Sequence, residues 1–255
     1  NERIYTYMKR NIRLTIEYDG SRYQGWQRLG GDSSANTIQG KLEAVLSKMT
    51  GEDVNINGSG RTDAGVHAYG QVANFHTNCM MSLGDIKEYL TKYLPSDISI
   101  VEVSEASERF HSRLNAKEKT YLYRIAIPGV SNVFERKYLW YFPETLDVKK
   151  MEEAASLLIG THNFKGFSSI KKTKKSTIRT IYDIKIKKTK KEIQITYTGN
   201  GFLHNMVRIL TGTLVEVGCG KIKPADITKA LESTKRADAG ITAPPQGLFL
   251  VSVEY

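Results

Sequence analysis

Hydrophobic residues in the first half of the chain follow two different spacings. Residues 12–18 alternate between apolar and polar positions, which is typical of a strand with one buried face. Residues 37–49 instead carry apolar side chains three or four positions apart, so we predict a helix there, with Thr37 as its N-terminal cap. In chain order the expected elements are a strand at 12–18, a helix at 37–49, strands at 54–57 and 71–76, a helix at 83–94 and a strand at 98–103. This order predicts a ferredoxin-like half, with an antiparallel sheet and its helices on one face.

The second half of the chain repeats the pattern of elements, although not the sequence. A strand at 119–127 carries Tyr121 and Tyr123 on one face. The elements expected after it are a short paired segment at 138–142, a helix at 148–159, a basic hairpin of strands 178–187 and 192–198, helices at 202–217 and 224–231, and a strand at 248–254. We therefore predict an α+β fold of two ferredoxin-like halves, residues 1–113 and 114–255, whose mainly antiparallel sheets join edge to edge and leave a central cleft.

Composition is that of a globular protein with a sizeable core. The 255 residues are 40% hydrophobic and 25% charged, and no apolar run approaches the roughly 20 residues of a membrane span. The N-terminal residues lack the apolar stretch of a secretory signal. The two cysteines, Cys79 and Cys219, are solitary and far apart, which fits thiols in a reducing cytoplasm better than a disulfide or a zinc site.

Positive charge is concentrated in one part of the chain. The formal net charge is +10, and residues 165–191 contain eleven Lys or Arg against one acid, Asp183, so this window accounts for the whole excess. A local basic stripe suits a polyanion such as a nucleic acid, because each neutralised phosphate releases counterions. A solvated lysine-rich hairpin would show the same composition, and composition alone leaves both readings open.

A glycine-rich loop with a single carboxylate joins the strands expected at 54–57 and 71–76. Its sequence, GSGRTDAGVHA, places Asp63 two residues after Arg61 and two before Gly65. Thr-Asp-Ala-Gly is also good turn chemistry, since Asp bonds its own backbone and Gly accepts positive φ. From this stretch alone, an ordinary polar turn and a catalytic loop are both consistent with the residues.

Five sequence blocks, in order, resemble the TruA family of tRNA pseudouridine synthases. They are YDGSRYQGWQ with NTIQGKLE, GRTDAGVHA with GQVANF, FHSRLNAKEKTYLYRI, FLHNMVRILTGTLVEVG and GLFLVSVEY, and they span about residues 14–255. The resemblance implies an isomerase that converts uridines 38, 39 and 40 of the tRNA anticodon stem-loop to pseudouridine. It implies no metal, no organic cofactor, and a homodimer in which each tRNA contacts both subunits.

The resemblance also assigns roles to individual residues. Asp63 matches the essential aspartate, the nucleophile, which attacks either the ribose carbon C1′ or the base. Arg61 would occupy the space left by the flipped base or grip the adjacent phosphate, and Tyr121 would stack on the uracil and assist proton loss at C5. Arg208 would pair with Asp63, because an arginine in a mostly apolar helix needs a partner. The expected tRNA-binding residues are Lys171, Lys172, Lys174, Lys175 and Arg179.

Two other classes of protein compete with this interpretation. A non-catalytic RNA-binding protein or RNA chaperone of ferredoxin-like fold would share the order of elements, but the chain lacks the aromatic strand signature of an RRM. A metal hydrolase fails because the five histidines include no HExxH pair and the cysteines no CxxC pair. The simultaneous presence of Asp63, Tyr121 and Arg208 in matched blocks favours the isomerase.

Overall fold

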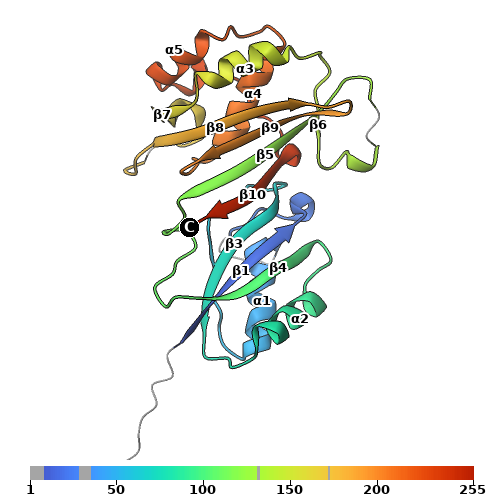
Figure 1. Ribbon diagram of the computed structural model, residues 1–255, viewed down its shortest axis with the longest axis vertical. Coiled ribbons are helices and arrows are strands. Elements are labelled where there is room, and N and C mark those ends of the chain that lie inside the picture. The colour runs from blue at the N-terminus through green and yellow to red at the C-terminus, as the bar shows by residue number, and fades with distance from the viewer. Residues whose placement is uncertain (1–8, 29–35, 131–132, 172) are drawn as a thin grey trace, which may run out of the picture. The chain divides into compact units, whose positions relative to one another are not determined.

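The computed structural model describes residues 9–28, 36–130, 133–171 and 173–255. The chain divides into an N-terminal unit, Asn1–Ala116 with Tyr255, and a C-terminal unit, Lys117–Glu254. Both units are mixed α+β, with mostly antiparallel strands, and Figure 1 labels their elements. The predicted α+β class is therefore confirmed.

The N-terminal unit contains the six predicted elements in the predicted order. They are β1 (Arg10–Tyr18), α1 (Ile38–Thr50), β2 (Asn57–Gly58), β3 (His67–Thr77), α2 (Leu83–Tyr93) and β4 (Ile98–Ala106). The sheet order is β4-β1-β3, with β2 hydrogen-bonded to β3, and every pairing is antiparallel. Helix α1 begins where predicted, because the Thr37 side chain accepts a hydrogen bond from the Gly40 N–H.

Strand β2 is shorter than the predicted strand at 54–57. Side chains of α1 accept the hydrogen bonds that a neighbouring strand would otherwise accept. The Val54 N–H donates to Ser47 Oγ at 3.0 Å, and the Ile56 N–H donates to Glu43 Oε1 at 3.1 Å. Val54 and Ile56 are buried even so. Apolar alternation thus predicted burial correctly and sheet pairing incorrectly, because a helix side chain can satisfy a backbone donor as well as a strand can.

The C-terminal unit contains the predicted elements and one strand that was missed. They are β5 (Glu118–Ala126), β6 (Trp140–Tyr141), α3 (Val148–Ser156), β7 (Gly160–Asn163), β8 (Ile178–Lys188), β9 (Glu192–Gly199), α4 (Met206–Gly218), α5 (Asp226–Ser233) and β10 (Leu248–Glu254). The sheet order is β10-β5-β9-β8-β7, all antiparallel, while β6 pairs with β5 in parallel. The missed strand, β7, is short and polar, so it carries no hydrophobic period.

Helix α4 begins four residues later than predicted. Asn205 has φ 60° and ψ 5°, a left-handed conformation that ends any helical path entering from Phe202. From Met206 onward the helix is mostly buried, and it packs against α3. Residues 202–205, of which Leu203 is buried and His204 exposed, therefore precede the helix rather than forming its first turn.

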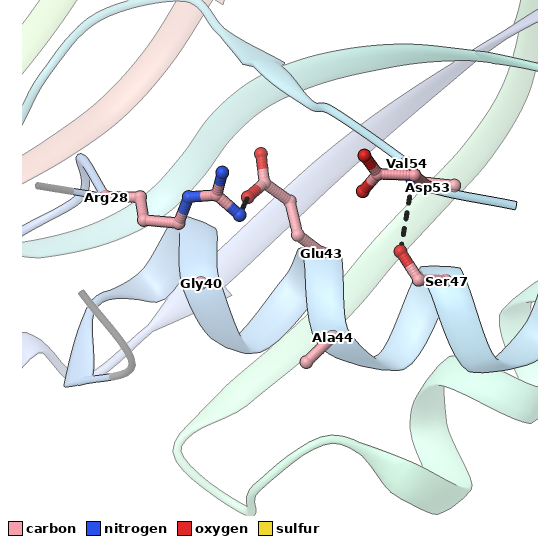
Figure 2. A pocket seen from close by; sticks show the side chains of 7 residues that line it. All are labelled: Arg28, Gly40, Glu43, Ala44, Ser47, Asp53 and Val54. Atoms are coloured by element: carbon pink, nitrogen blue, oxygen red, sulfur yellow. Dashed lines mark hydrogen bonds and ion pairs between the residues drawn. The ribbon is translucent and has the colours of Figure 1, made fainter. Parts of the chain in front are cut away.

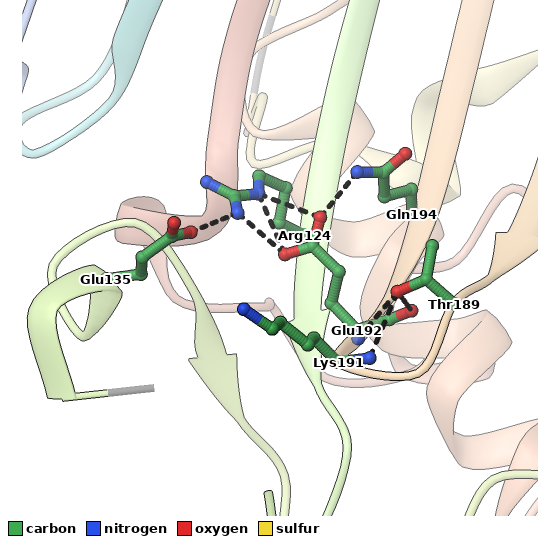
Figure 3. Close-up of polar contacts among 6 residues, drawn as sticks. All are labelled: Arg124, Glu135, Thr189, Lys191, Glu192 and Gln194. Carbon is green, nitrogen blue, oxygen red and sulfur yellow. Dashed lines mark hydrogen bonds and ion pairs between the residues drawn. The ribbon is translucent and has the colours of Figure 1, made fainter. Parts of the chain in front are cut away.

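A partly buried ion-pair network joins β5 to β9 in the C-terminal unit (Figure 3). Arg124 donates to both carboxylate oxygens of Glu192, with distances of 3.0 Å and 2.7 Å to Oε2, and also to Glu135. Burial by itself would lower the pKa of the Arg124 guanidinium. The hydrogen bonds and charges of Glu192 and Glu135 together have the larger effect, so this pKa is raised above its ordinary value. Glu192 also closes the turn between β8 and β9, because its backbone N–H donates to Thr189 Oγ1.

We expect Glu192→Ala to lower the free energy of unfolding by about 2 kcal/mol, because it leaves Arg124 partly buried beside a single remaining carboxylate. Glu135→Ala is the matched control: its carboxylate binds the same guanidinium but is about half exposed, so its loss should cost less than about 1 kcal/mol. Urea unfolding of the two variants measures the difference. Equal costs would mean that burial of Glu192 contributes nothing to the pair.

Candidate active site

Asp63 lies in the loop between β2 and β3, in the N-terminal unit. Within this loop Arg61 is exposed, Thr62 is buried and Asp63 is partly exposed. The loop closes on itself through a hydrogen bond from the Val66 N–H to the Asp63 carbonyl at 3.1 Å. The Asp-Ala-Gly turn expected from the sequence is present, and Gly65 adopts φ 78° as that chemistry requires.

The backbone next to Asp63 is held from two sides. The Trp26 N–H donates to the Thr62 carbonyl at 3.0 Å, and the Thr62 hydroxyl is hydrogen-bonded to the Tyr18 hydroxyl at 2.8 Å. Burial raises the pKa of Tyr18 to about 12, so this hydroxyl is neutral at ordinary pH. Gly25, at φ 98°, makes the approach possible, because a Cβ there would lie 2.5 Å from the Thr62 carbonyl oxygen.

Both ends of the loop are anchored by buried polar side chains. Upstream, Gln71 donates to the Gly60 carbonyl at 3.0 Å and accepts from the Ser59 hydroxyl at 2.6 Å. Downstream, the Nδ1 atom of His67, a fully buried side chain, accepts from the Gly20 N–H at 3.0 Å. His67 therefore serves the loop as a structural residue.

Tyr121 and Tyr123 lie two residues apart on β5, in the C-terminal unit, and differ in their surroundings. Tyr121 is 8% exposed, and its ring packs edge-on against Phe202 at a centroid distance of 5.2 Å. Tyr123 is fully buried, and its hydroxyl donates to the Pro244 carbonyl at 2.6 Å. Burial raises the pKa of Tyr123 well above its ordinary value. The Tyr123 hydroxyl is thus engaged by a backbone carbonyl within the C-terminal unit.

Arg208 lies in the first turn of α4, where it is partly buried. Its Nε donates to the Ala243 carbonyl at 2.7 Å, and its Nη1 donates to Asn205 Oδ1 at 2.8 Å. The backbone reinforces the first contact, because the Ala243 N–H donates to the Arg208 carbonyl at 3.0 Å. Two bonds from one planar guanidinium fix both its position and the direction of its plane.

The expected tRNA-binding residues of the C-terminal unit fall into two kinds. Lys171, Lys174 and Lys175 are exposed in the segment before β8, and Lys172 lies outside the described residues. Arg179 differs, because its Nη1 donates to the carbonyls of Ser176 and Ile178 and burial lowers the pKa of its guanidinium below the ordinary value. Arg179 thus bonds the backbone between the lysine segment and the start of β8.

A hollow of about 220 Å³ lies against α1 in the N-terminal unit, and none of its lining residues belongs to the Asp63 loop. Figure 2 shows the Arg28 guanidinium directed at the Glu43 carboxylate, at 3.1 Å, with Asp53 also in the lining. Two carboxylates against one guanidinium make this hollow unsuited to a polyanion. Nor does any group of three or more His, Cys, Asp or Glu suited to a metal occur in the part of the chain that the structure describes.

Comparison with known proteins matches most of the chain to one family. The family model described as tRNA pseudouridine synthase matches residues 14–115 and 154–255. The chain belongs to the tRNA pseudouridine synthase family. It is 50% identical to tRNA pseudouridine synthase A 1 of Clostridium tetani over 246 residues, which cover 96% of this chain and 100% of the relative. It is 47% identical to tRNA pseudouridine synthase A 2 of Bacillus cereus over 245 residues, 96% of this chain and 99% of the relative.

Among solved structures, a chain of a Cbf5-Nop10-Gar1 complex matches with a TM-score of 0.39 and 10% identity, covering 94% of this chain and 49% of that one. A likeness this weak carries no argument about this pseudouridine synthase. Across the described ranges, no helix has both the length and the apolar content that crossing a membrane requires.

Sequence reasoning about this pseudouridine synthase missed the residues that support the candidate site. Tyr18, Thr62 and Gln71 read as ordinary strand and loop positions, and only the fold shows that their polar atoms meet around the Asp63 loop. Asn205 had a weak signal, since it precedes Arg208 by three residues and such pairs face one another at the start of a helix.

The close approach at Gly25 leads to a testable difference between two glycines. Gly25→Ala should cost about 3 kcal/mol of stability and lower kcat by about 100-fold, because its Cβ would push the Thr62 carbonyl away and displace the neighbouring Asp63. Gly51→Ala is the control: Gly51 also has positive φ, 72°, but no atom lies within 4 Å of its added Cβ, so it should cost about 1 kcal/mol with kcat unchanged. Thermal unfolding and tRNA turnover measure both effects, and an equal loss of turnover in the two variants would contradict the steric argument.

Proposed function

We propose that this tRNA pseudouridine synthase isomerises uridines 38, 39 and 40 in the anticodon stem-loop, with Asp63 as the nucleophile. The observation that carries the proposal is the state of the Asp63 loop: its backbone is held by Trp26 and Tyr18 through Thr62, while the carboxylate-bearing residue remains partly exposed. Two separate segments, one at Trp26 and one at Tyr18, therefore hold the residue next to Asp63. The resemblance of the GRTDAGVHA block to the TruA family supplies the role.

The reaction exchanges one glycosidic bond for another. The bond from ribose C1′ to N1 of uracil breaks, the bond from C1′ to C5 forms, C5 loses a proton and N1 gains one. Because no atom is oxidised and no water or phosphate is consumed, we propose that the enzyme needs neither a metal nor an organic cofactor. The protein must instead supply a nucleophile, exclude water and retain the detached ring.

The remaining site residues fit the other requirements of this reaction. Tyr121, mostly buried against Phe202, would stack on the flipped uracil and assist removal of the C5 proton. Arg208, with its guanidinium held by Ala243 and Asn205, would pair with Asp63, as the resemblance to the TruA family implies. Arg61, exposed on the loop, would occupy the space of the everted base or hold its phosphate.

Binding of the tRNA backbone is assigned to the basic segment before β8. Lys171, Lys174 and Lys175 are exposed cations without an acid between them in sequence, and Lys172 belongs to the same run. Contacts of this kind position an RNA without reading its sequence. Arg179 would join them from the start of β8.

We also infer that residues 1–113 and 114–255 form two ferredoxin-like halves. Support comes from the strand order, since β1, β2, β3 and β4 follow the same pattern in the N-terminal unit as β5, β8, β9 and β10 in the C-terminal unit: fourth, first, third, second. From the resemblance to the TruA family we further propose a homodimer in the cytoplasm, where the two free cysteines would stay reduced.

We expect Asp63→Asn to lower pseudouridine formation by roughly 1,000-fold or more while tRNA binding persists, because the amide keeps the size of the side chain and loses the nucleophile. Asp53→Asn, which changes an exposed carboxylate in the same unit, should leave turnover unchanged. Mapping of pseudouridine in tRNA after incubation with each protein, alongside a binding isotherm, separates the two steps. Wild-type turnover by Asp63→Asn would overturn the assigned mechanism, and RNA binding without any pseudouridine in the wild-type reaction would favour the non-catalytic RNA-binding protein.

We expect simultaneous reversal of Lys171, Lys174 and Lys175 to Glu to raise KM by about 10-fold and to flatten its dependence on salt, because fewer phosphates are neutralised. Reversal of Lys149, Lys150 and Lys229, exposed lysines on α3 and α5, changes the net charge equally and serves as the control. Turnover measured across a salt series distinguishes a local contact from a general charge effect. Identical salt slopes in the two triple variants would remove the lysine segment from the RNA interface.

A further inference from the structure

Asn205 has a left-handed backbone conformation, which asparagine adopts more readily than most other non-glycine residues. Among the described residues, Asn205 and Thr234 are the non-glycine positions with positive φ, at 60° and 54°. Asn205 also occupies the N-cap position of α4, for which asparagine is among the preferred residues, yet its side chain makes no capping hydrogen bond. The Asn205 side chain therefore does not cap α4, and its hydrogen bonds are made with other partners.

The Asn205 amide connects Arg208 to the segment that leads into the lysines. Its Oδ1 accepts from Arg208 Nη1 at 2.8 Å, and its Nδ2 donates to Ser169 Oγ at 2.8 Å. A backbone bond lies beside this bridge, from the Ser169 N–H to the His204 carbonyl at 3.1 Å. Ser169 stands two residues before Lys171, so the amide joins the base of the lysine segment to the guanidinium.

We propose that Asn205 is a positioning residue for Arg208, and that its amide couples the orientation of the guanidinium to the base of the tRNA-binding lysine segment. The inference rests on the proposed function, in which Arg208 pairs with Asp63. The Ala243 carbonyl accepts a hydrogen bond from Nε and so holds one edge of the guanidinium. The second bond, to Asn205 Oδ1, fixes the plane and so aims the remaining N–H donors.

A purely structural role for Asn205 makes a different prediction from a positioning role. If Asn205 only provided the left-handed turn before α4, glycine would replace it with no loss, because glycine adopts positive φ without steric cost. If the amide positions Arg208, glycine preserves the turn and removes both side-chain bonds. Alanine removes the same bonds and adds the strain of a Cβ in the left-handed region.

The experiment compares Asn205→Gly, Asn205→Ala and Thr234→Gly in the full-length enzyme. Thr234→Gly is the matched control, since it relieves the same kind of strain at the end of α5, away from the Arg208 contacts. We expect Asn205→Gly to keep or raise the Tm and to lower kcat by about 10- to 100-fold with the tRNA Kd within about twofold of wild type. Asn205→Ala should lose kcat to the same extent at a lower Tm, and Thr234→Gly should keep wild-type kcat.

Ser169→Ala adds a test that does not alter the backbone at Asn205. It removes one of the two partners of the amide at an exposed position, so we expect an unchanged Tm and a kcat lowered by about threefold. A kcat that follows Tm across the Asn205 variants, or an Asn205→Gly enzyme with wild-type kcat, would overturn the proposal.

Arg208→Ala separates failure of this inference from failure of the proposed function. Loss of turnover in Arg208→Ala together with full turnover in Asn205→Gly would refute the positioning role alone. Full turnover in Arg208→Ala would refute the active-site role of Arg208, and the positioning role with it.

Discussion

The position of Asp63 depends on how closely two backbone segments approach each other at Gly25 and Thr62. The Trp26 N–H reaches the Thr62 carbonyl only because Gly25 has no side chain and adopts positive φ. On its other side Thr62 is bonded to a buried, neutral tyrosine hydroxyl. The proposed nucleophile thus lies on a loop whose backbone is held in place at the neighbouring residue, Thr62.

The same principle of support by a neighbour recurs at Arg208. Its guanidinium is held by a carbonyl of the 240–244 segment and by the side chain that begins α4, and the backbone of that segment bonds back to Arg208. Tyr123 contributes from β5 by bonding the carbonyl of Pro244. Side chains from strand β5 and helix α4 of the C-terminal unit thus bond the backbone carbonyls of Pro244 and Ala243 in one irregular segment.

Charge is distributed unevenly between recognition and chemistry. The window from residue 165 to 191 carries the whole net charge of the protein, whereas the Asp63 loop carries one acid and one base. Long-range attraction of a polyanion requires many exposed cations, and bond exchange at one carbon requires a few groups held rigidly. Under the proposed function, the exposed lysines before β8 would meet the first demand and the loop before β3 the second.

Sequence by itself determined the order of the helices and of the strands other than β7, the α+β class, the basic window and, through matched blocks, the family, because each of these depends on local periodicity, composition or motif. It also pointed to Asp63, Tyr121 and Arg208 as residues to examine. Only the tertiary structure decided that Val54 and Ile56 bond to α1 side chains instead of a long β2, that α4 starts after Asn205, and that Tyr18 meets Thr62. The hydrogen bonds of Val54, Ile56 and Tyr18 join residues from 7 to 44 positions apart. A hydrogen bond of that kind leaves no period in the sequence for a local pattern to reveal.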